Sequence, residues 1–222
     1  ISPRAQGFRT SITGEAGGDQ DSEDEVGSAA SRPAHSTQET VTATTQHLRF
    51  MTLALRLAAK GQGKTSPNPT VGALVVKDGR IVGRGYHHGP GKPHAEILAL
   101  NQAGRRAKGA TLYVTLEPCC HLLKRTPPCV PAIIRSGVRQ VVVAMADPNR
   151  QVKGRGIVAL RRAGIAVTTD VAQEKASQLN RWYSHWATTG LPYVILKAGM
   201  TLDGKIATAK GESRWITGRP AR

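Results

Sequence analysis

All three cysteines of this 222-residue chain lie in one short stretch, EPCCHLLKRTPPC, at positions 117–129. An odd number of thiols cannot close a complete disulfide set, and no secretory signal is visible. We therefore expect a reducing, intracellular setting, in which clustered cysteines indicate a metal site or catalysis. One histidine with two of these thiolates would hold Zn²⁺ in three of its four tetrahedral positions and leave the fourth to water.

The stretch His94-Ala95-Glu96 supplies the missing partners at the start of an expected helix. Residues two apart on a helix point in different directions, so the histidine can bind a metal while the glutamate reaches past it. Zinc lowers the pKa of a bound water toward ~7, and Glu96 would carry the proton of that water to a ring nitrogen. The order H-x-E, then P-C, then a second cysteine is typical of zinc deaminases. A structural zinc knuckle is the alternative, but a structural site has no need of Glu96.

Apolar patterns predict the elements that position these residues. Helices are expected over 50–61, 93–104, 130–137, the first part of 155–170, and 172–190; strands are expected in a hairpin over 71–87 around Asp78-Gly79, and over 110–118, 139–149 and the end of 155–170. This alternation predicts a three-layer α/β/α domain with a mixed, mainly parallel central sheet. No apolar run approaches the ~18 residues of a membrane span.

Composition divides the chain into three parts. Residues 1–46 are rich in Ser, Thr, Gly and acidic groups, and we predict a disordered low-complexity tail. Residues 47–189 would form the zinc-dependent domain. Residues 190–222 are too few for a core of their own. We expect them to be the first strand or strands of an incomplete second α/β domain, whose exposed apolar surface would favour self-association.

Charge indicates the class of partner. Residues 1–50 carry four Arg and seven Asp or Glu, whereas the whole chain has a net charge of +16, so the remainder is strongly basic. A basic domain favours a phosphorylated small molecule or a nucleic acid, although genomic bias toward arginine or an acidic partner domain explains the charge equally well. Two Phe, four Tyr and three Trp provide few surfaces for stacking bases, which argues against nucleic acid.

Residues 47–215 closely resemble the bifunctional riboflavin-biosynthesis deaminase/reductase family. The matching stretches are SPNPTVGALVVKDGRIVGRGYH, PHAE, TLYVTLEPC, RTPPC, VVVAMADPN, LPYVILKAGMTLDGKIAT and SRWIT. The resemblance implies a cytidine-deaminase-like fold and a cytoplasmic enzyme with one Zn²⁺. Its reaction would be hydrolytic deamination of a diamino-ribosylamino-pyrimidinone 5′-phosphate. A tRNA or other nucleotide deaminase on the same fold, and a non-catalytic zinc module, remain the alternatives.

The resemblance also implies roles for individual residues. His94, Cys119 and Cys129 would bind zinc, and Glu96 would be the proton shuttle. Contacts to the base are implied for Asn68 and His87, and contacts to the ribose and phosphate for His121, Lys124 or Arg125, Asp147 and Asn149. From the residues alone, Asp147 and Asn149 could equally be turn-formers, and His121 could be an ordinary surface residue.

Two features depart from the family pattern. Nine residues separate Cys119 from Cys129, where the family usually has eight, and Cys120 stands where the family often has Ser. Using Cys120 as the ligand would restore the usual spacing, but we favour Cys119 because it directly follows Pro118. The family also carries an NADPH-dependent reductase, whose opening motif matches Lys197, Asp203 and Lys205. The chain ends at Arg222, so we expect no NADPH binding by this fragment.

Overall fold

The computed structural model describes residues 35–120, 126–213, 216 and 218. Its centre is a five-stranded sheet in the order β2-β1-β3-β4-β5. The strands are β1 (Gly72–Lys77), β2 (Arg80–Tyr86), β3 (Thr111–Val114), β4 (Gln140–Val143) and β5 (Ala166–Thr168). β1 pairs antiparallel with both β2 and β3, while β3, β4 and β5 are parallel. The sheet is therefore mixed. Each of the parallel strands β3 and β4 leads into a loop at its carboxyl end.

The expected hairpin forms around its turn. Asp78 and Gly79 both have positive φ, at 49° and 73°, between β1 and β2. Two successive positive φ values match the twist of a tight two-residue hairpin, and an Asp-Gly pair tolerates them well. The prediction of a hairpin around Asp78-Gly79 is confirmed.

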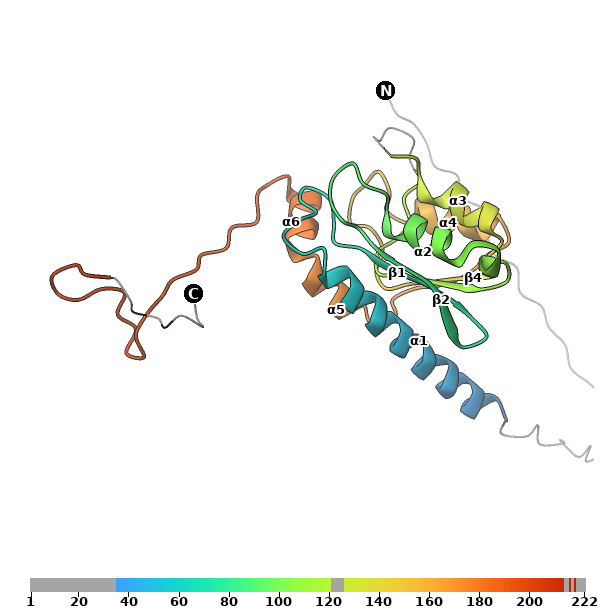
Figure 1. The fold of residues 1–222 in the computed structure, drawn as a ribbon, viewed down its shortest axis with the longest axis horizontal. Helices are drawn as coiled ribbons and strands as arrows, with labels where there is room; N and C mark the ends of the chain where they lie inside the picture. Colours follow the sequence, from blue (N-terminus) through green and yellow to red (C-terminus); the bar gives the residue numbers. More distant parts are fainter. Residues whose placement is uncertain (1–34, 121–125, 214–215, 217, 219–222) are drawn as a thin grey trace, which may run out of the picture.

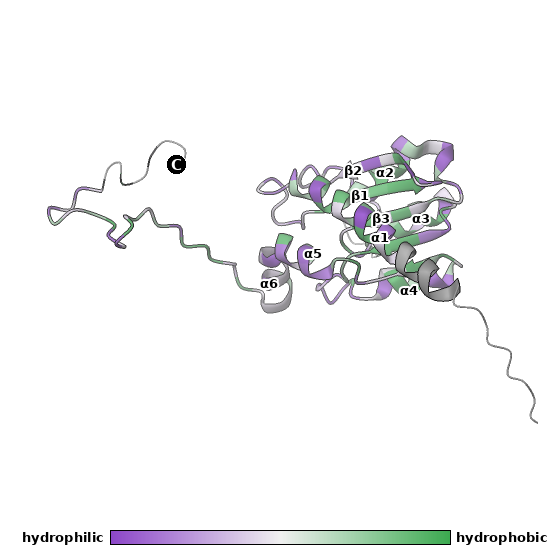
Figure 2. Ribbon diagram, turned by 90° about the horizontal axis from the view of Figure 1, so that it is seen from below, coloured by the Kyte–Doolittle hydropathy of each residue, from purple (hydrophilic) through white to green (hydrophobic). Residues whose placement is uncertain are grey.

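Helices cover both faces of the sheet (Figures 1 and 2). One face packs against α2 (Ala95–Ala103), α3 (Cys129–Ser136) and α4 (Arg155–Arg162), and the other packs against α1 (His35–Ala59), α5 (Gln173–Leu179) and α6 (Arg181–Thr189). A short 3₁₀ turn, η1 (Gly104–Ala107), follows α2. Side chains alternate along β1, so Ala73 and Val75 face the first group while Leu74 and Val76 face the second. The three-layer α/β/α fold is thus the one the alternating pattern predicts.

Two glycines of β2 allow α2 to lie close against the sheet. A Cβ atom at Gly83 would collide with the carbonyl oxygen of Ala99, and one at Gly85 would collide with that of Ala95. Only glycine permits this backbone approach. The close packing fixes the start of α2, where His94 and Glu96 lie.

The expected start of the first helix is wrong. α1 begins at His35, so the predicted disordered tail is helical over residues 35–46, while residues 1–34 lie outside the described part of the chain. Phe50, Met51 and Ala54 anchor the helix by burial against the sheet. Once a helix is nucleated, each further residue adds one hydrogen bond, so a polar segment can extend it.

The C-terminal part also differs from expectation. The helix predicted over 172–190 is two helices, α5 and α6, which meet at Asn180. After Gly190, the described residues form no strand and lead away from the domain (Figure 1). Val194, Leu196 and Leu202 are exposed by 81%, 92% and 109%. The expected strand does not form there because a strand needs a neighbour for its backbone hydrogen bonds. No helix of the described residues is both long and apolar enough to cross a bilayer.

Candidate active site

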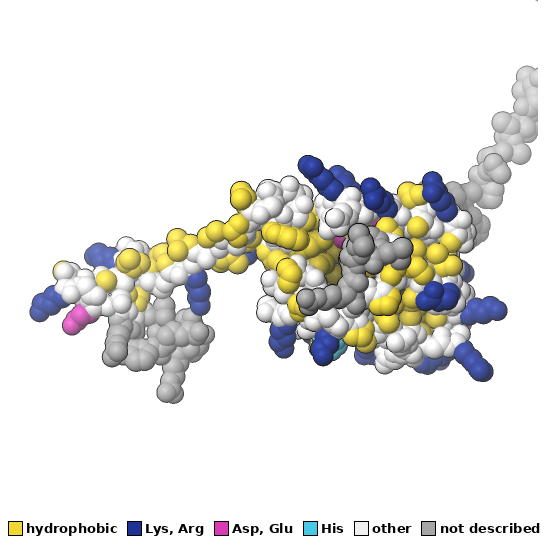
Figure 3. Space-filling view, turned by 90° about the horizontal axis from the view of Figure 1, so that it is seen from above, with side chains coloured by type: hydrophobic (Ala, Val, Ile, Leu, Met, Phe, Trp, Pro, Cys, Tyr) yellow, Lys and Arg dark blue, Asp and Glu magenta, His cyan; other side chains and the backbone are white. Residues whose placement is uncertain are grey.

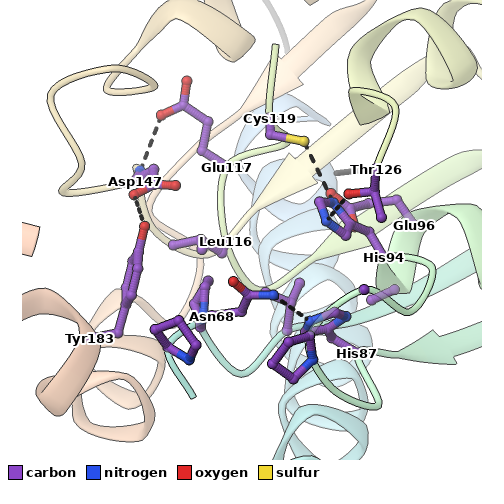
Figure 4. A pocket seen from close by; sticks show the side chains of 16 residues that line it. Asn68, His87, His94, Glu96, Leu116, Glu117, Cys119, Thr126, Asp147 and Tyr183 are labelled. Carbon is purple, nitrogen blue, oxygen red and sulfur yellow. Dashed lines mark hydrogen bonds between the residues drawn. The ribbon is translucent and has the colours of Figure 1, made fainter. Parts of the chain in front are cut away.

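A cavity of about 390 Å³ opens where the loops after β3 and β4 meet the start of α2. Its lining includes His94, Glu96, Cys119, Asn68 and Asp147, which approach one another from different elements (Figure 4). Sites in open sheets of this kind form at the carboxyl ends of parallel strands. The cavity therefore gathers most of the residues that the sequence pattern singled out.

Three side chains form a compact set of metal donors. The donor atoms of His94, Cys119 and Cys129 all lie within 4.8 Å of one another. His94 Nδ1 is 3.1 Å from Cys129 Sγ and 3.5 Å from Cys119 Sγ. Tetrahedral zinc, bonded at about 2.0–2.1 Å to nitrogen and about 2.3 Å to sulfur, would place such atoms about 3.6 Å apart. The residues fit a single Zn²⁺.

Local structure brings the two cysteines together across the long loop. Cys129 is the first residue of α3, and its N–H donates to the carbonyl oxygen of Cys119 at 3.0 Å. The same N–H lies 3.4 Å from Cys119 Sγ. The pKa of the Cys129 thiol is raised chiefly by its hydrogen bond with Cys119 and, to a smaller extent, by its burial. A doubly charged cation is what would hold both sulfurs as thiolates.

Cys120 is not part of this cluster. It is half-buried, and burial raises the pKa of its thiol. Cys119, by contrast, is buried and lies beside His94. Of the two adjacent thiols, the structure therefore brings Cys119 to the other donors, despite the additional residue in the loop.

Glu96 lies in the first turn of α2 and lines the cavity. Its side chain is buried, with 3% exposure. Burial and the nearby Cys119 thiolate raise the pKa of its carboxyl group, partly offset by His94. A raised pKa makes a carboxyl group better suited to accept a proton and return it.

Thr126 contacts the far side of the His94 ring. Its Oγ1 lies 3.1 Å from His94 Nε2, while Nδ1 faces the two sulfurs. Such a partner fixes the orientation and tautomer of a metal-binding imidazole. Sequence reasoning missed this role, because the TPPC stretch shows only that a hydroxyl precedes the cysteine and not which group it meets.

Asn68 and His87 lie side by side in the cavity wall. Asn68 Nδ2 is 3.1 Å from His87 Nε2, and His87 Nδ1 is 3.3 Å from the carbonyl oxygen of Pro93. A protonated Nδ1 can donate to this carbonyl, so that Nε2 accepts from the Asn68 amide. Asn68 then keeps its Oδ1 as an acceptor for a ligand.

Asp147 combines a turn role with a place in the cavity. Its Oδ1 accepts from the backbone N–H of Asn149 at 2.9 Å and from the hydroxyl of Tyr183 at 2.8 Å. Asn149 Oδ1 accepts from the N–H of Gln151, and Asn149 is not among the residues that line the cavity. Both residues therefore act in the turn, and Asp147 also faces the cavity.

Glu117 is a further residue whose role the sequence did not reveal. Its buried carboxylate accepts four backbone hydrogen bonds, from the N–H groups of Asp147, Gly154, Gly156 and Ile157, at 2.9–3.2 Å. Glu117 also directly precedes the Pro118-Cys119 pair. It therefore joins the zinc loop, which follows β3 and carries Cys119, to the loop that carries Asp147.

The remaining predicted site residues are not among those that line the described part of the cavity. His121, Lys124 and Arg125 fall outside the described residues. Lys197, Asp203 and Lys205 lie on the exposed segment after Gly190, where Lys205 and Asp203 form an ion pair at 3.0 Å.

The fold and the donor set define a domain of the zinc-dependent cytidine deaminase class. Residues 44–145 match the family described as the cytidine and deoxycytidylate deaminase zinc-binding region, and residues 192–222 match the RibD C-terminal domain. The chain is a homologue of the RibD riboflavin biosynthesis proteins, which confirms the resemblance seen in its motifs.

Several known proteins are similar to this chain in sequence and in structure. The riboflavin biosynthesis protein RibD of Aquifex aeolicus is 58% identical over 173 residues, which cover 78% of this chain and 48% of the relative. The structure of Acinetobacter baumannii RibD is 48% identical and has a TM-score of 0.76, with 81% of this chain and 50% of that chain covered. A Thermotoga maritima diaminohydroxyphosphoribosylaminopyrimidine deaminase/5-amino-6-(5-phosphoribosylamino)uracil reductase is 45% identical, with a TM-score of 0.75 over 79% of this chain and 51% of that chain. The chain spans about half the length of these relatives.

Proposed function

We propose that this chain catalyses the hydrolytic deamination of a diamino-ribosylamino-pyrimidinone 5′-phosphate in the cytoplasm. The product would be the corresponding amino-pyrimidinedione phosphate, with release of ammonia. One observation carries the proposal: the buried Glu96 carboxyl lines the same cavity as the His94 and Cys119 donors. The name of the Thermotoga maritima relative supports the choice of substrate.

His94, Cys119 and Cys129 would hold one Zn²⁺. When bound, Zn²⁺ acts as a Lewis acid that lowers the pKa of a coordinated water toward ~7. Glu96 would accept a proton from the attacking water and pass it to the ring nitrogen, and a second transfer would let ammonia leave. Thr126 would hold the His94 ring in the orientation seen in the structure.

The other cavity residues would recognise the substrate. Asn68 Oδ1 can accept a hydrogen bond from an amino or ring N–H group of the pyrimidine, because its Nδ2 is engaged by His87. Asp147 would accept from a ribose hydroxyl. Outside the described residues, we assign the phosphate to His121 with Lys124 or Arg125, since cationic groups suit a phosphate.

We also infer that the segment after Gly190 favours self-association. Its apolar side chains are largely exposed along the segment (Figure 3), and Leu196 is exposed by 92%. Contiguous exposed apolar surface commonly marks a contact site. Size-exclusion chromatography over a range of protein concentrations tests this inference, and a concentration-independent monomer would contradict it.

The decisive test measures ammonia release from the pyrimidinone phosphate, with zinc determined by metal analysis. Glu96→Gln keeps the size of the side chain but removes its proton transfer, so we expect about one zinc per chain and a loss of turnover of at least ~100-fold. Glu174→Gln, on the exposed surface of α5, is the matched control and should retain full activity.

The other outcomes separate the alternatives. Turnover on RNA with none on the small nucleotide would favour a nucleic-acid deaminase. Zinc binding without turnover in either protein would favour a non-catalytic zinc module. Equal turnover by the wild type and Glu96→Gln would exclude the assigned role of Glu96.

A further inference from the structure

The junction between α5 and α6 contacts two separate loops of the cavity. Asn180 lies at this junction, and Tyr183 lies one turn later in α6. Both are buried, with 0% and 5% exposure. Neither falls within residues 44–145, which match the deaminase zinc-binding region.

Asn180 binds the loop that carries Asn68. The N–H of Thr70 donates to Asn180 Oδ1 at 2.7 Å, and Asn180 Nδ2 donates to the carbonyl oxygen of Thr70 at 2.9 Å. A side-chain amide that bonds both the N–H and the C=O of one residue fixes the position and the orientation of the backbone at that residue. Thr70 is itself fully buried and lies two residues after Asn68.

Tyr183 binds the loop that carries Asp147. Its hydroxyl donates to Asp147 Oδ1 at 2.8 Å, and both side chains line the cavity (Figure 4). Burial, together with Asp147, raises the pKa of the Tyr183 hydroxyl, so the hydroxyl remains a donor at neutral pH. From the other side, Glu117 accepts the Asp147 backbone N–H at 3.1 Å.

We propose that Asn180 and Tyr183 are positioning residues that set the placement of Asn68 and Asp147 in the substrate cavity. The inference rests on the proposed function, because those two residues are assigned to the base and the ribose. α6 ends at Thr189, three residues before the part that matches the RibD C-terminal domain. The α5–α6 junction and α6 lead into the part that matches the RibD C-terminal domain. They thus also hold two loops of the cavity in the deaminase domain.

The first test is hydrogen exchange read by mass spectrometry. Tyr183→Phe removes one hydroxyl, and we expect faster exchange in peptides that cover residues 145–154 only. Asn180→Ala should speed exchange in peptides that cover residues 65–71. Tyr193→Phe, on the exposed segment, and Asn101→Ala, on the exposed side of α2, are matched controls that should exchange like the wild type.

The second test is steady-state kinetics with the pyrimidinone phosphate. Asn68 and Asp147 would bind the substrate equally in its ground and transition states, so misplacing them should raise KM with little change in kcat. We expect KM to rise roughly tenfold in each variant, the usual cost of one well-placed hydrogen bond to a charged or polar group. If Asn180→Ala does not fold, Asn180→Asp takes its place, since it keeps the acceptor for the Thr70 N–H.

The outcomes distinguish this inference from the proposed function. Unchanged exchange in both loops, or an equal increase over the whole domain, would overturn the positioning role. A loss in kcat with KM unchanged would also overturn it. If the wild type does not deaminate the substrate but the two loops respond as expected, the positioning role stands and the proposed function fails.

Discussion

The Glu117 carboxylate accepts a hydrogen bond at 2.9 Å from the backbone N–H of Gly156, which lies 39 residues later in the chain. A Cβ atom at Gly156 would collide with the carbonyl oxygen of Pro118, so this contact also needs a glycine. The residue before the zinc loop is therefore fixed to the start of α4. The N–H of Ile157 in α4 donates to the same oxygen, and those of Asp147 and Gly154 donate to the other, so Glu117 also fixes the loop that holds Asp147.

Glu117→Gln should destabilise the domain although it barely changes the side-chain volume. The amide offers one acceptor in place of two, and its NH₂ group would face backbone donors that are buried. We expect a loss of about 3 kcal/mol in the free energy of unfolding, measured by denaturant titration. Glu174→Gln, which is exposed on α5, should change it by less than about 0.5 kcal/mol. A loss below about 1 kcal/mol in Glu117→Gln would show that water replaces the carboxylate.

Cys119→Ser and Cys120→Ser form a matched pair of neighbouring substitutions. Only Cys119 lies in the donor cluster with His94 and Cys129. We therefore expect Cys119→Ser to retain less than about a tenth of the zinc, while Cys120→Ser keeps about one zinc per chain. Metal analysis after gel filtration measures both. Zinc loss in Cys120→Ser alone would show that the shorter spacing is the one used.

Local patterns predicted most of the fold and the order of the donors. The hairpin at Asp78-Gly79, the alternating strands and the placement of His94 at a helix start all depend on neighbours within a few residues. The choice between Cys119 and Cys120 was harder, because adjacent residues in an irregular loop have no periodicity to separate them. The structure favours Cys119, because the start of α3 places Cys129 beside it.

Contacts that span the chain could not be predicted in this way. Asn180 lies 110 residues from Thr70 in sequence, and nothing local marks it as more than a residue in a helical pattern. Glu117 likewise resembles any acidic residue before a turn until its four distant donors are known. The extension of α1 back to His35 was missed because polar composition indicates disorder when the anchoring contacts of the helix are not visible.

The folded state should lose stability at mildly acidic pH through His47. Burial lowers the pKa of His47 from its ordinary value of 6.5, and its Nδ1 lies 2.9 Å from the Tyr113 hydroxyl. Burial also raises the pKa of Tyr113 to about 12, so this hydroxyl stays protonated and can donate to the neutral imidazole. Below pH 6.5 the unfolded chain takes up a proton that the folded chain resists, so this contribution is present above that value and is lost as pH falls toward the folded pKa.

His47→Gln should therefore flatten the stability profile between about pH 5 and 6.5, measured by urea unfolding at several pH values. Tyr113→Phe is a companion variant, since removing the hydroxyl weakens the preference for neutral His47 and should reduce the slope in part. An unchanged slope in both variants would assign the pH dependence to other groups.

Zinc affinity should depend on a hydroxyl that does not touch the metal. With Nδ1 of His94 facing the sulfurs, its Nε2–H can donate to Thr126 Oγ1 at 3.1 Å. Thr126→Val keeps the shape of the side chain but removes this acceptor, so the ring is free to turn. We expect zinc affinity to fall by about 10-fold or more, measured by competition with a chromogenic chelator. Thr126→Ser should restore most of the affinity, and Thr188→Val, on the exposed side of α6, should not change it. Equal affinity in Thr126→Val and the wild type would mean that packing alone orients the imidazole, and the hydroxyl would then have no part in holding the metal.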